Sequence, residues 1–186
     1  MYSERVERAI RLALSAHAGQ MRKADPQIPY ATHPVHVALM VQEAGGQEDG
    51  VIAGLLHDLL EDTDVTPEDL EYEFGARVNA IVQEVSEDKS LPWRVRKGRM
   101  VERLRSASPE ACLVAAADKI HNLETLVEAH KRAGPGIWKA FRGKPEETMR
   151  FSKDVFEALR GRIPQSLEAA FSRALNAGFD LIAPGA

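Results

Sequence analysis

The chain has 186 residues, 44% of them hydrophobic and 28% charged, which fits one globular domain spanning residues 1–186 with a sizeable core. Its formal net charge of −4 argues against non-specific binding to nucleic acid or to an anionic membrane surface, and no apolar run approaches the ~20 residues that span a bilayer. The single cysteine, Cys112, excludes an internal disulfide, and the charged N-terminus does not resemble a secretory signal, so a reducing, cytoplasmic setting is favoured.

The first quarter of the chain predicts two helices joined by a loop. Apolar residues recur at helical spacing over residues 3–19, with Ser3 as a suitable N-cap. A second helix is expected over 33–45, with proline at its first position and glycine at its end. The intervening residues 20–32 contain two prolines, which disfavour both helix and strand, so we expect a loop. Its Arg22-Lys23 pair suits a ligand loop and a solvated connector equally well.

Four ionisable side chains interrupt an apolar helix that is expected over residues 48–61. His57 and Asp58 are followed, one helical turn later, by Glu61 and Asp62. In a continuous helix, residues four apart lie above one another, so His57 should lie over Glu61 and Asp58 over Asp62. Buried charges cost several kcal/mol unless they are paired or bound to metal. The stretch therefore indicates a bound cation, with carboxylates left over for proton transfer.

The remainder of the chain is also predicted to be helical. Helices are expected over residues 66–74, 77–86, 93–106, 111–131, 145–160 and 164–177, with a short turn over 137–141 and a loose end at 184–186. The helix at 93–106 is strongly basic, which is typical of a solvated face but also suits a phosphate-binding side. Because no segment alternates like a strand, the predicted fold class is all-α, with about eight to ten helices.

Candidate metal ligands come from three of these helices. Asp118 follows five apolar residues, and on its own a hydrogen bond to a neighbouring helix would explain it. Together with His33, His57 and Asp58, it offers two imidazoles and two carboxylates, most of a divalent metal site. Such mixed ligands suit Mn²⁺, Fe²⁺, Co²⁺ or Zn²⁺. Residues 61 and 62 follow one turn later, within reach for general acid and base catalysis.

The order His33, His57-Asp58, Asp118 resembles the H…HD…D signature of the HD superfamily, an all-helical group of metal-dependent phosphohydrolases. Six segments, which include the signature residues, extend the resemblance: residues 16–23, 29–34, 57–63, 74–75, 85–92 and 117–123. In order and spacing they resemble the hydrolase domain of the RelA/SpoT proteins. The similarity covers about residues 5–126 and is greatest to the stand-alone small alarmone hydrolases, including the metazoan SpoT homologue.

This resemblance implies a Mn²⁺-dependent hydrolase that converts (p)ppGpp to GDP or GTP and pyrophosphate. It implies Mn²⁺ ligands at the four residues of the signature and water activation by Glu61 and Asp62. It also implies that Arg22 meets the guanine base with Lys23 alongside it, while Asn122 and Thr125 lie against the nucleoside. The expected partner is thus a small nucleotide, and a homo-oligomer through the basic helix, Trp93 and Trp138 is compatible with the sequence.

Four positions depart from the pattern of the small alarmone hydrolases: Trp93, Glu124, Lys144 and Thr148. The family usually has a basic residue at the first, Arg or Met at the second, and substrate-contacting Arg and Tyr at the last two. These departures keep open a second substrate class, another nucleotide or phosphorylated metabolite such as NADPH losing its 2′-phosphate. A non-catalytic HD nucleotide-binding module is a third interpretation, although it would have no reason to retain Glu61 and Asp62 with all four ligands.

Overall fold

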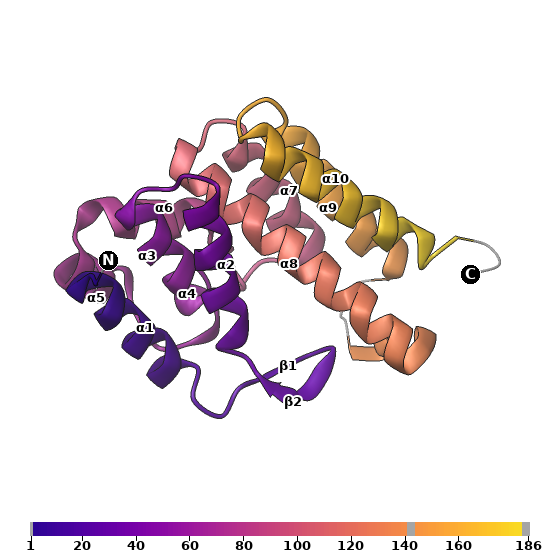
Figure 1. Cartoon of the computed structure of the whole chain (residues 1–186), viewed down its shortest axis with the longest axis horizontal. Helices are drawn as coiled ribbons and strands as arrows, with labels where there is room; N and C mark the ends of the chain where they lie inside the picture. The colour runs from indigo at the N-terminus through magenta and orange to yellow at the C-terminus, as the bar shows by residue number, and fades with distance from the viewer. Residues whose placement is uncertain (1, 141–143, 184–186) are drawn as a thin grey trace.

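The computed structural model describes residues 2–140 and 144–183 and confirms the all-helical fold class (Figure 1). Within these residues it contains ten α-helices, a short 3₁₀ helix and a two-stranded sheet. The elements are α1 (Glu4–Ala16), β1 (Met21–Arg22), β2 (Asp25–Pro29), α2 (Thr32–Glu43), α3 (Glu48–Leu56), α4 (Leu59–Asp62), α5 (Pro67–Phe74), α6 (Ala76–Val85), α7 (Trp93–Leu104), α8 (Pro109–Ala133), η1 (Gly134–Ala140), α9 (Pro145–Leu159) and α10 (Gln165–Asp180). Phe141 and the loose end expected at 184–186 lie outside the described residues. No helix among the described residues has the length and apolar character needed to cross a membrane.

The long helix α8 is the central element of the molecule (Figure 1). It contacts α2, α3 and α6 from the first half of the chain and α9 and α10 from the second half. The N-terminal half of α8, which is rich in alanine and valine, is buried, and so is the middle of the helix. Both agree with the apolar sequence. Because α8 carries Asp118 in this buried middle, the carboxylate lies inside the fold and not on its surface.

Helix starts follow the capping chemistry of the sequence. Ser3 accepts a hydrogen bond from the backbone of Val6, and Ser108 caps α8 in the same way. Thr66 and Asp69 form a complete capping box at the start of α5. These local interactions explain why α1, α5 and α8 start within two residues of the predicted positions, whereas α1 ends at Ala16, three residues before its predicted end.

The continuous helix predicted over residues 48–61 is wrong, because α3 ends at Leu56 and α4 begins at Leu59. The imidazole Nδ1 of His57 donates a 2.8 Å hydrogen bond to the carbonyl of Gly54, an acceptor that a continuing helix would use for its own backbone. His57 and Asp58 therefore occupy a turn between two helices. The expected stacking of His57 over Glu61 within one regular helix does not apply.

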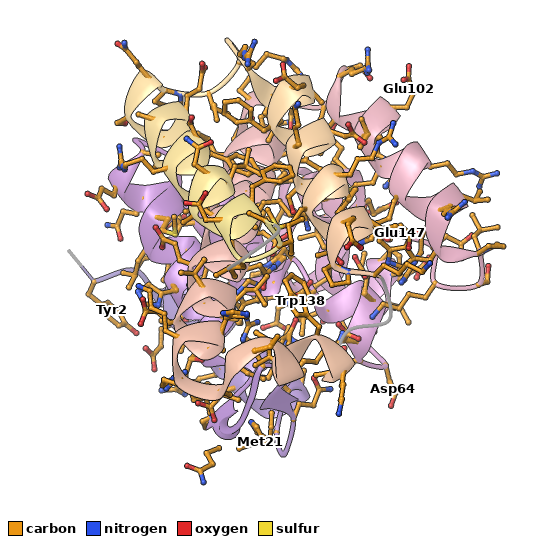
Figure 2. All side chains as sticks on the ribbon, turned by 90° about the vertical axis from the view of Figure 1, so that its right-hand side faces the viewer. Tyr2, Met21, Asp64, Glu102, Trp138 and Glu147 are labelled. Atoms are coloured by element: carbon orange, nitrogen blue, oxygen red, sulfur yellow. The ribbon has the colours of Figure 1, made fainter. Side chains whose placement is uncertain are left out.

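The loop predicted over residues 20–32 is also wrong in part, since it contains the antiparallel strands β1 and β2. Met21 pairs with Pro29 and Arg22 with Asp25. Strand β2 contains Pro26 and Pro29. A proline lacks a backbone N–H group, but each strand of a two-stranded sheet has one unpaired edge on which no such donor is needed. The hairpin lies at the periphery, where the exposed side chain of Met21 can be seen in Figure 2. The helix that follows starts at Thr32, so Pro34 is its third residue rather than its first.

Helices α2 and α3 pack closely at Gly54. A Cβ added there would lie 3.1 Å from the Cα of Ala38 and 3.3 Å from its nitrogen, so the backbone of α2 would have to move. We expect Gly54→Ala to lower the free energy of unfolding by about 1–3 kcal/mol, as overpacking typically does. Urea denaturation followed by circular dichroism measures this change.

Gly98→Ala is the matched control for this experiment. Gly98 lies inside α7, and a Cβ added there meets nothing within 4 Å. Helix propensity alone should make this variant neutral or more stable by up to about 1 kcal/mol. An unchanged denaturation midpoint in Gly54→Ala would contradict the close approach of the two helices.

Candidate active site and metal centre

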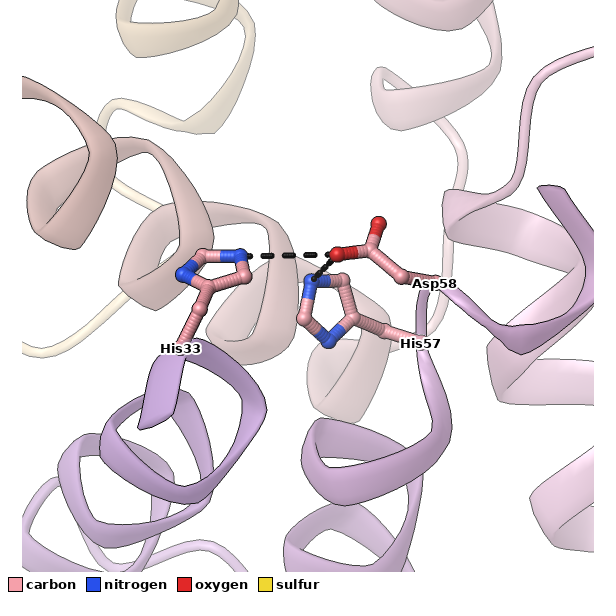
Figure 3. A group of neighbouring side chains, drawn as sticks. All are labelled: His33, His57 and Asp58. Atoms are coloured by element: carbon pink, nitrogen blue, oxygen red, sulfur yellow. Dashed lines mark ion pairs between the residues drawn. The ribbon is translucent and has the colours of Figure 1, made fainter. Parts of the chain in front are cut away.

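His33, His57 and Asp58 form a compact cluster of potential metal ligands (Figure 3). His33 comes from the first turn of α2, whereas the other two occupy the turn between α3 and α4. The Oδ2 atom of Asp58 lies 3.5 Å from Nε2 of His33 and 3.1 Å from Nε2 of His57. One potential ligand atom from each residue falls within 4.8 Å of the others. This cluster can hold a metal ion.

Asp118 brings a second carboxylate from α8 to the same point. Its Oδ1 atom lies 3.2 Å from Nε2 of His33 and 3.9 Å from Nε2 of His57. The other oxygen, Oδ2, accepts a 2.6 Å hydrogen bond from Lys119. The fold thus brings together all four side chains that the sequence selected as candidate ligands.

The hydrogen bonds and the charge environment of His57 fit a metal site. His57 donates through Nδ1 to Gly54, and its buried Nε2 has no hydrogen-bond partner within the described part of the chain. Burial disfavours a charged ring, but the carboxylates of Asp58 and Asp118 outweigh burial and raise the pKa of His57 to about 9. The carboxylates of Asp58 and Asp118 therefore favour positive charge beside His57. A divalent cation bound there would interact favourably with the same two carboxylates.

Glu61 and Asp62 occupy different environments although they are neighbours in α4. Glu61 is largely buried, and its Oε1 accepts a 2.9 Å hydrogen bond from the backbone nitrogen of Glu87. Burial and the negative charges of Asp58 and Glu87 raise the pKa of Glu61 to about 7. Asp62 is more exposed and pairs with Lys89. Glu61 is therefore the better suited of the two to exchange a proton near neutral pH.

Three of the four predicted substrate-binding residues contact one another. The guanidinium of Arg22, on β1, donates to Oδ1 of Asn122 at 2.9 Å and to Oγ1 of Thr125 at 3.2 Å. Asn122 also donates to Oδ1 of Asp118 at 2.5 Å, so these residues are connected directly to the candidate metal ligands. Lys23 is exposed and lies on the wall of the same pocket.

The pocket has a volume of about 270 Å³ and includes residues that the sequence did not single out. Tyr30 donates a hydrogen bond from its hydroxyl to Asp58. Lys119 lines the pocket, as do Arg96 and Lys97, which form ion pairs with Glu87. The sequence did contain a signal for Arg96 and Lys97. Positions 93, 96, 97 and 100 have the spacing of one helix face, and all four of these residues line the pocket. The basic helix α7 thus has one face on the pocket and another in solvent.

The four positions that depart from the small alarmone hydrolases divide into two groups. Trp93 and Thr148 line the pocket, and Trp93 packs edge-on against Phe151 with ring centres 6.4 Å apart. Glu124 and Lys144 do not occur among the described residues that line it; Glu124 is exposed on α8 and lines a neighbouring hollow. Only two of the departures can therefore change the shape of this pocket directly.

A family model described as an HD domain matches residues 9–146. The chain belongs to the HD-domain family. Guanosine-3′,5′-bis(diphosphate) 3′-pyrophosphohydrolase MESH1 of Mus musculus and that of Homo sapiens are each 40% identical to this HD-domain chain over 153 residues. The match covers 81% of the chain and 82% of each relative.

A solved structure of a metazoan SpoT ortholog that hydrolyses ppGpp also matches this HD-domain fold. Its TM-score is 0.82 at 32% sequence identity, and the match covers 95% of this chain and 96% of that one. The resemblance inferred from the separated motifs is thus confirmed at the level of family and fold.

Proposed function

We propose that the chain is a Mn²⁺-dependent hydrolase that removes the 3′-diphosphate of (p)ppGpp, giving GDP or GTP and pyrophosphate. The observation that carries this proposal is the convergence of two imidazoles and two carboxylates at a pocket that is also lined by Arg22, Asn122 and Thr125. The activity named for the MESH1 relatives, at 40% identity, supports the choice of substrate. The single cysteine, Cys112, cannot form an internal disulfide and so fits action in the reducing cytoplasm.

Each part of the pocket has a role in this proposal. His33, His57, Asp58 and Asp118 would hold the metal ion, which when bound neutralises phosphate charge and lowers the pKa of water. Glu61 takes a proton from the water that attacks the phosphorus next to the ribose. The bond between that phosphorus and the 3′-oxygen breaks, and the oxygen leaves as the 3′-hydroxyl with the proton that Glu61 took from water. Asp62 and Lys89 lie beside Glu61 and complete the proton-handling group.

Basic side chains of the pocket suit the diphosphate. The ammonium groups of Lys97 and Lys119 lie 4.3 Å and 5.3 Å from the centre of the Phe151 ring, so both cations gather around one aromatic side chain. Both line the pocket. They add positive charge to a pocket wall in which Lys97 pairs with Glu87 and Lys119 with Asp118, although the usual basic residue is replaced by Trp93.

A substrate panel tests the proposal. The Mn²⁺-loaded protein is incubated with ppGpp, NADPH, GTP and simple monophosphates, and the products are separated by ion-exchange chromatography. We expect ppGpp to disappear with equimolar release of pyrophosphate. If ppGpp is untouched while NADPH loses its phosphate, the second substrate class replaces the first. If no compound is hydrolysed while a nucleotide still binds, the chain is a non-catalytic HD module.

We expect Arg22→Lys to raise the KM for ppGpp roughly tenfold or more while leaving kcat within a few-fold of the wild type. The planar guanidinium that bonds to Asn122 and Thr125 is lost, and an ammonium group cannot reproduce its fork of donors. Charge-assisted hydrogen bonds contribute about 1.5–3 kcal/mol, and each 1.4 kcal/mol corresponds to a factor of ten. Steady-state kinetics with ppGpp measure the effect.

Arg11→Lys, on the exposed face of α1, is the control for the Arg22 experiment. Arg11 pairs only with Glu7 among the described residues, so its replacement should leave both kinetic constants unchanged. A loss of kcat with an unchanged KM in Arg22→Lys would show that Arg22 acts on the reacting atoms instead of on the nucleoside.

A further inference from the structure

His121 is a buried histidine on α8 that the proposed chemistry does not use. Its Nδ1 atom lies 2.8 Å from Nδ1 of His33, and the two side chains are 7% and 1% exposed. It follows Asp118 by three positions, so the same helix carries a proposed ligand and this contact. The ring of His36 lies next to His121, with ring centres 4.8 Å apart.

Two imidazole nitrogens at this distance share one proton, because each can either donate or accept a hydrogen bond. The other nitrogen of His33, Nε2, faces the carboxylates of Asp58 and Asp118. A nitrogen that binds a metal ion must present its lone pair. With a metal ion bound, the proton of His33 therefore resides on Nδ1, and Nδ1 of His121 must be the acceptor.

His57 provides an internal comparison. Its Nδ1 donates to the carbonyl of Gly54, and its Nε2 faces the carboxylate of Asp58. Both candidate imidazole ligands thus have Nδ1 tied to the protein and Nε2 directed at the same point. For His57 the acceptor is a backbone carbonyl, whereas for His33 it is the side chain of His121, which mutation can change.

We propose that His121 is a positioning residue of the metal centre, which accepts a hydrogen bond from Nδ1 of His33 and so holds the Nε2 atom of His33 toward the other ligands. The inference rests on the metal site of the proposed function. Its effect should appear in metal affinity, because removal of the acceptor leaves a buried N–H group of His33 without a partner.

Mn²⁺ affinity, measured by isothermal titration calorimetry on the whole chain without substrate, tests the inference. We expect His121→Leu to weaken Mn²⁺ binding about 10–100-fold, the usual cost of losing such a supporting group. His121→Asn should bind Mn²⁺ nearly as tightly as the wild type, because its Oδ1 acceptor takes the position of the Nδ1 atom. His36→Leu, which removes the adjacent ring but no bond to a ligand, should leave the affinity unchanged.

The outcomes separate this inference from the proposed function. A wild-type chain that binds no Mn²⁺ would overturn the metal site itself. If the wild type binds but a folded His121→Leu binds equally well, or His121→Asn loses as much as His121→Leu, the positioning role is overturned. Should the leucine variant fail to fold, ¹⁵N NMR of the imidazoles in the Zn²⁺-loaded wild type decides the matter. Protons on Nδ1 of His33 and Nε2 of His121 support the inference, and a proton on Nδ1 of His121 overturns it.

Discussion

Asp58→Ala should abolish metal binding and reduce hydrolysis of ppGpp to below about one thousandth of the wild-type rate. Asp58 presents one oxygen, Oδ2, to both His33 and His57, so its removal deprives both imidazoles of the same neighbour. Metal-ion assistance to phosphoryl transfer is worth several kcal/mol, and each 1.4 kcal/mol is a factor of ten in rate. Metal content by mass spectrometry and the initial rate with ppGpp measure the two effects separately.

Asp154→Ala is the matched control, because Asp154 is an exposed aspartate on α9 that does not line the pocket. It should keep wild-type metal content and rate. His57→Ala should behave like Asp58→Ala, since it removes another of the clustered ligands. Sustained turnover by a folded Asp58→Ala protein that contains no metal would disprove the metal-dependent mechanism as a whole.

Features that depend on neighbouring residues in the sequence could be predicted well. Ser3, Thr66 and Ser108 cap helices that begin where the sequence indicates. The apolar runs of α3 and α8 are buried as expected. In each case the deciding interaction spans only a few residues, so it can be recognised before the fold is known.

Features that depend on one particular bond, or on the fold, could not be predicted in this way. The break after Leu56 arises because the side chain of His57 takes the carbonyl of Gly54, and periodicity carries no information about that choice. The pairing of β1 with β2 joins a two-residue strand to a five-residue strand whose half-buried and exposed positions do not alternate. The ion pairs of Arg96 and Lys97 with Glu87 likewise join α7 to the loop before it, and helical spacing alone does not predict these partners.

The candidate site shows the same division. Ligand types and their order could be read from the sequence, and the fold brings His33, His57, Asp58 and Asp118 to one point. The groups that support them were missed, because their role is defined only by contacts across the fold. Tyr30 donates to Asp58 from a separate segment, and His121 contacts His33 across 88 positions of sequence.

Glu61→Gln should leave Mn²⁺ bound and lower kcat for ppGpp by a factor of roughly 100–10,000, the usual contribution of a general acid or base. Glutamine keeps the oxygen that accepts from the backbone of Glu87, so the local structure should be retained. The amide cannot take a proton from water. Glu73→Gln, an exposed position on α5, is the control and should keep the wild-type rate. A wild-type rate in Glu61→Gln would show that Glu61 is not the proton acceptor.

The pH profile gives an independent test of the same residue. A general base works only when it is deprotonated, so the rate should rise with pH through the pKa of Glu61. Burial and the charges of Asp58 and Glu87 raise that pKa to about 7, whereas a bound divalent cation would lower it again. The acid limb of the profile should therefore lie at or below pH 7, and it should disappear in Glu61→Gln. If the residual activity of the variant kept the wild-type acid limb, the limb would belong to another group, with Asp62 the nearest carboxylate on the same helix.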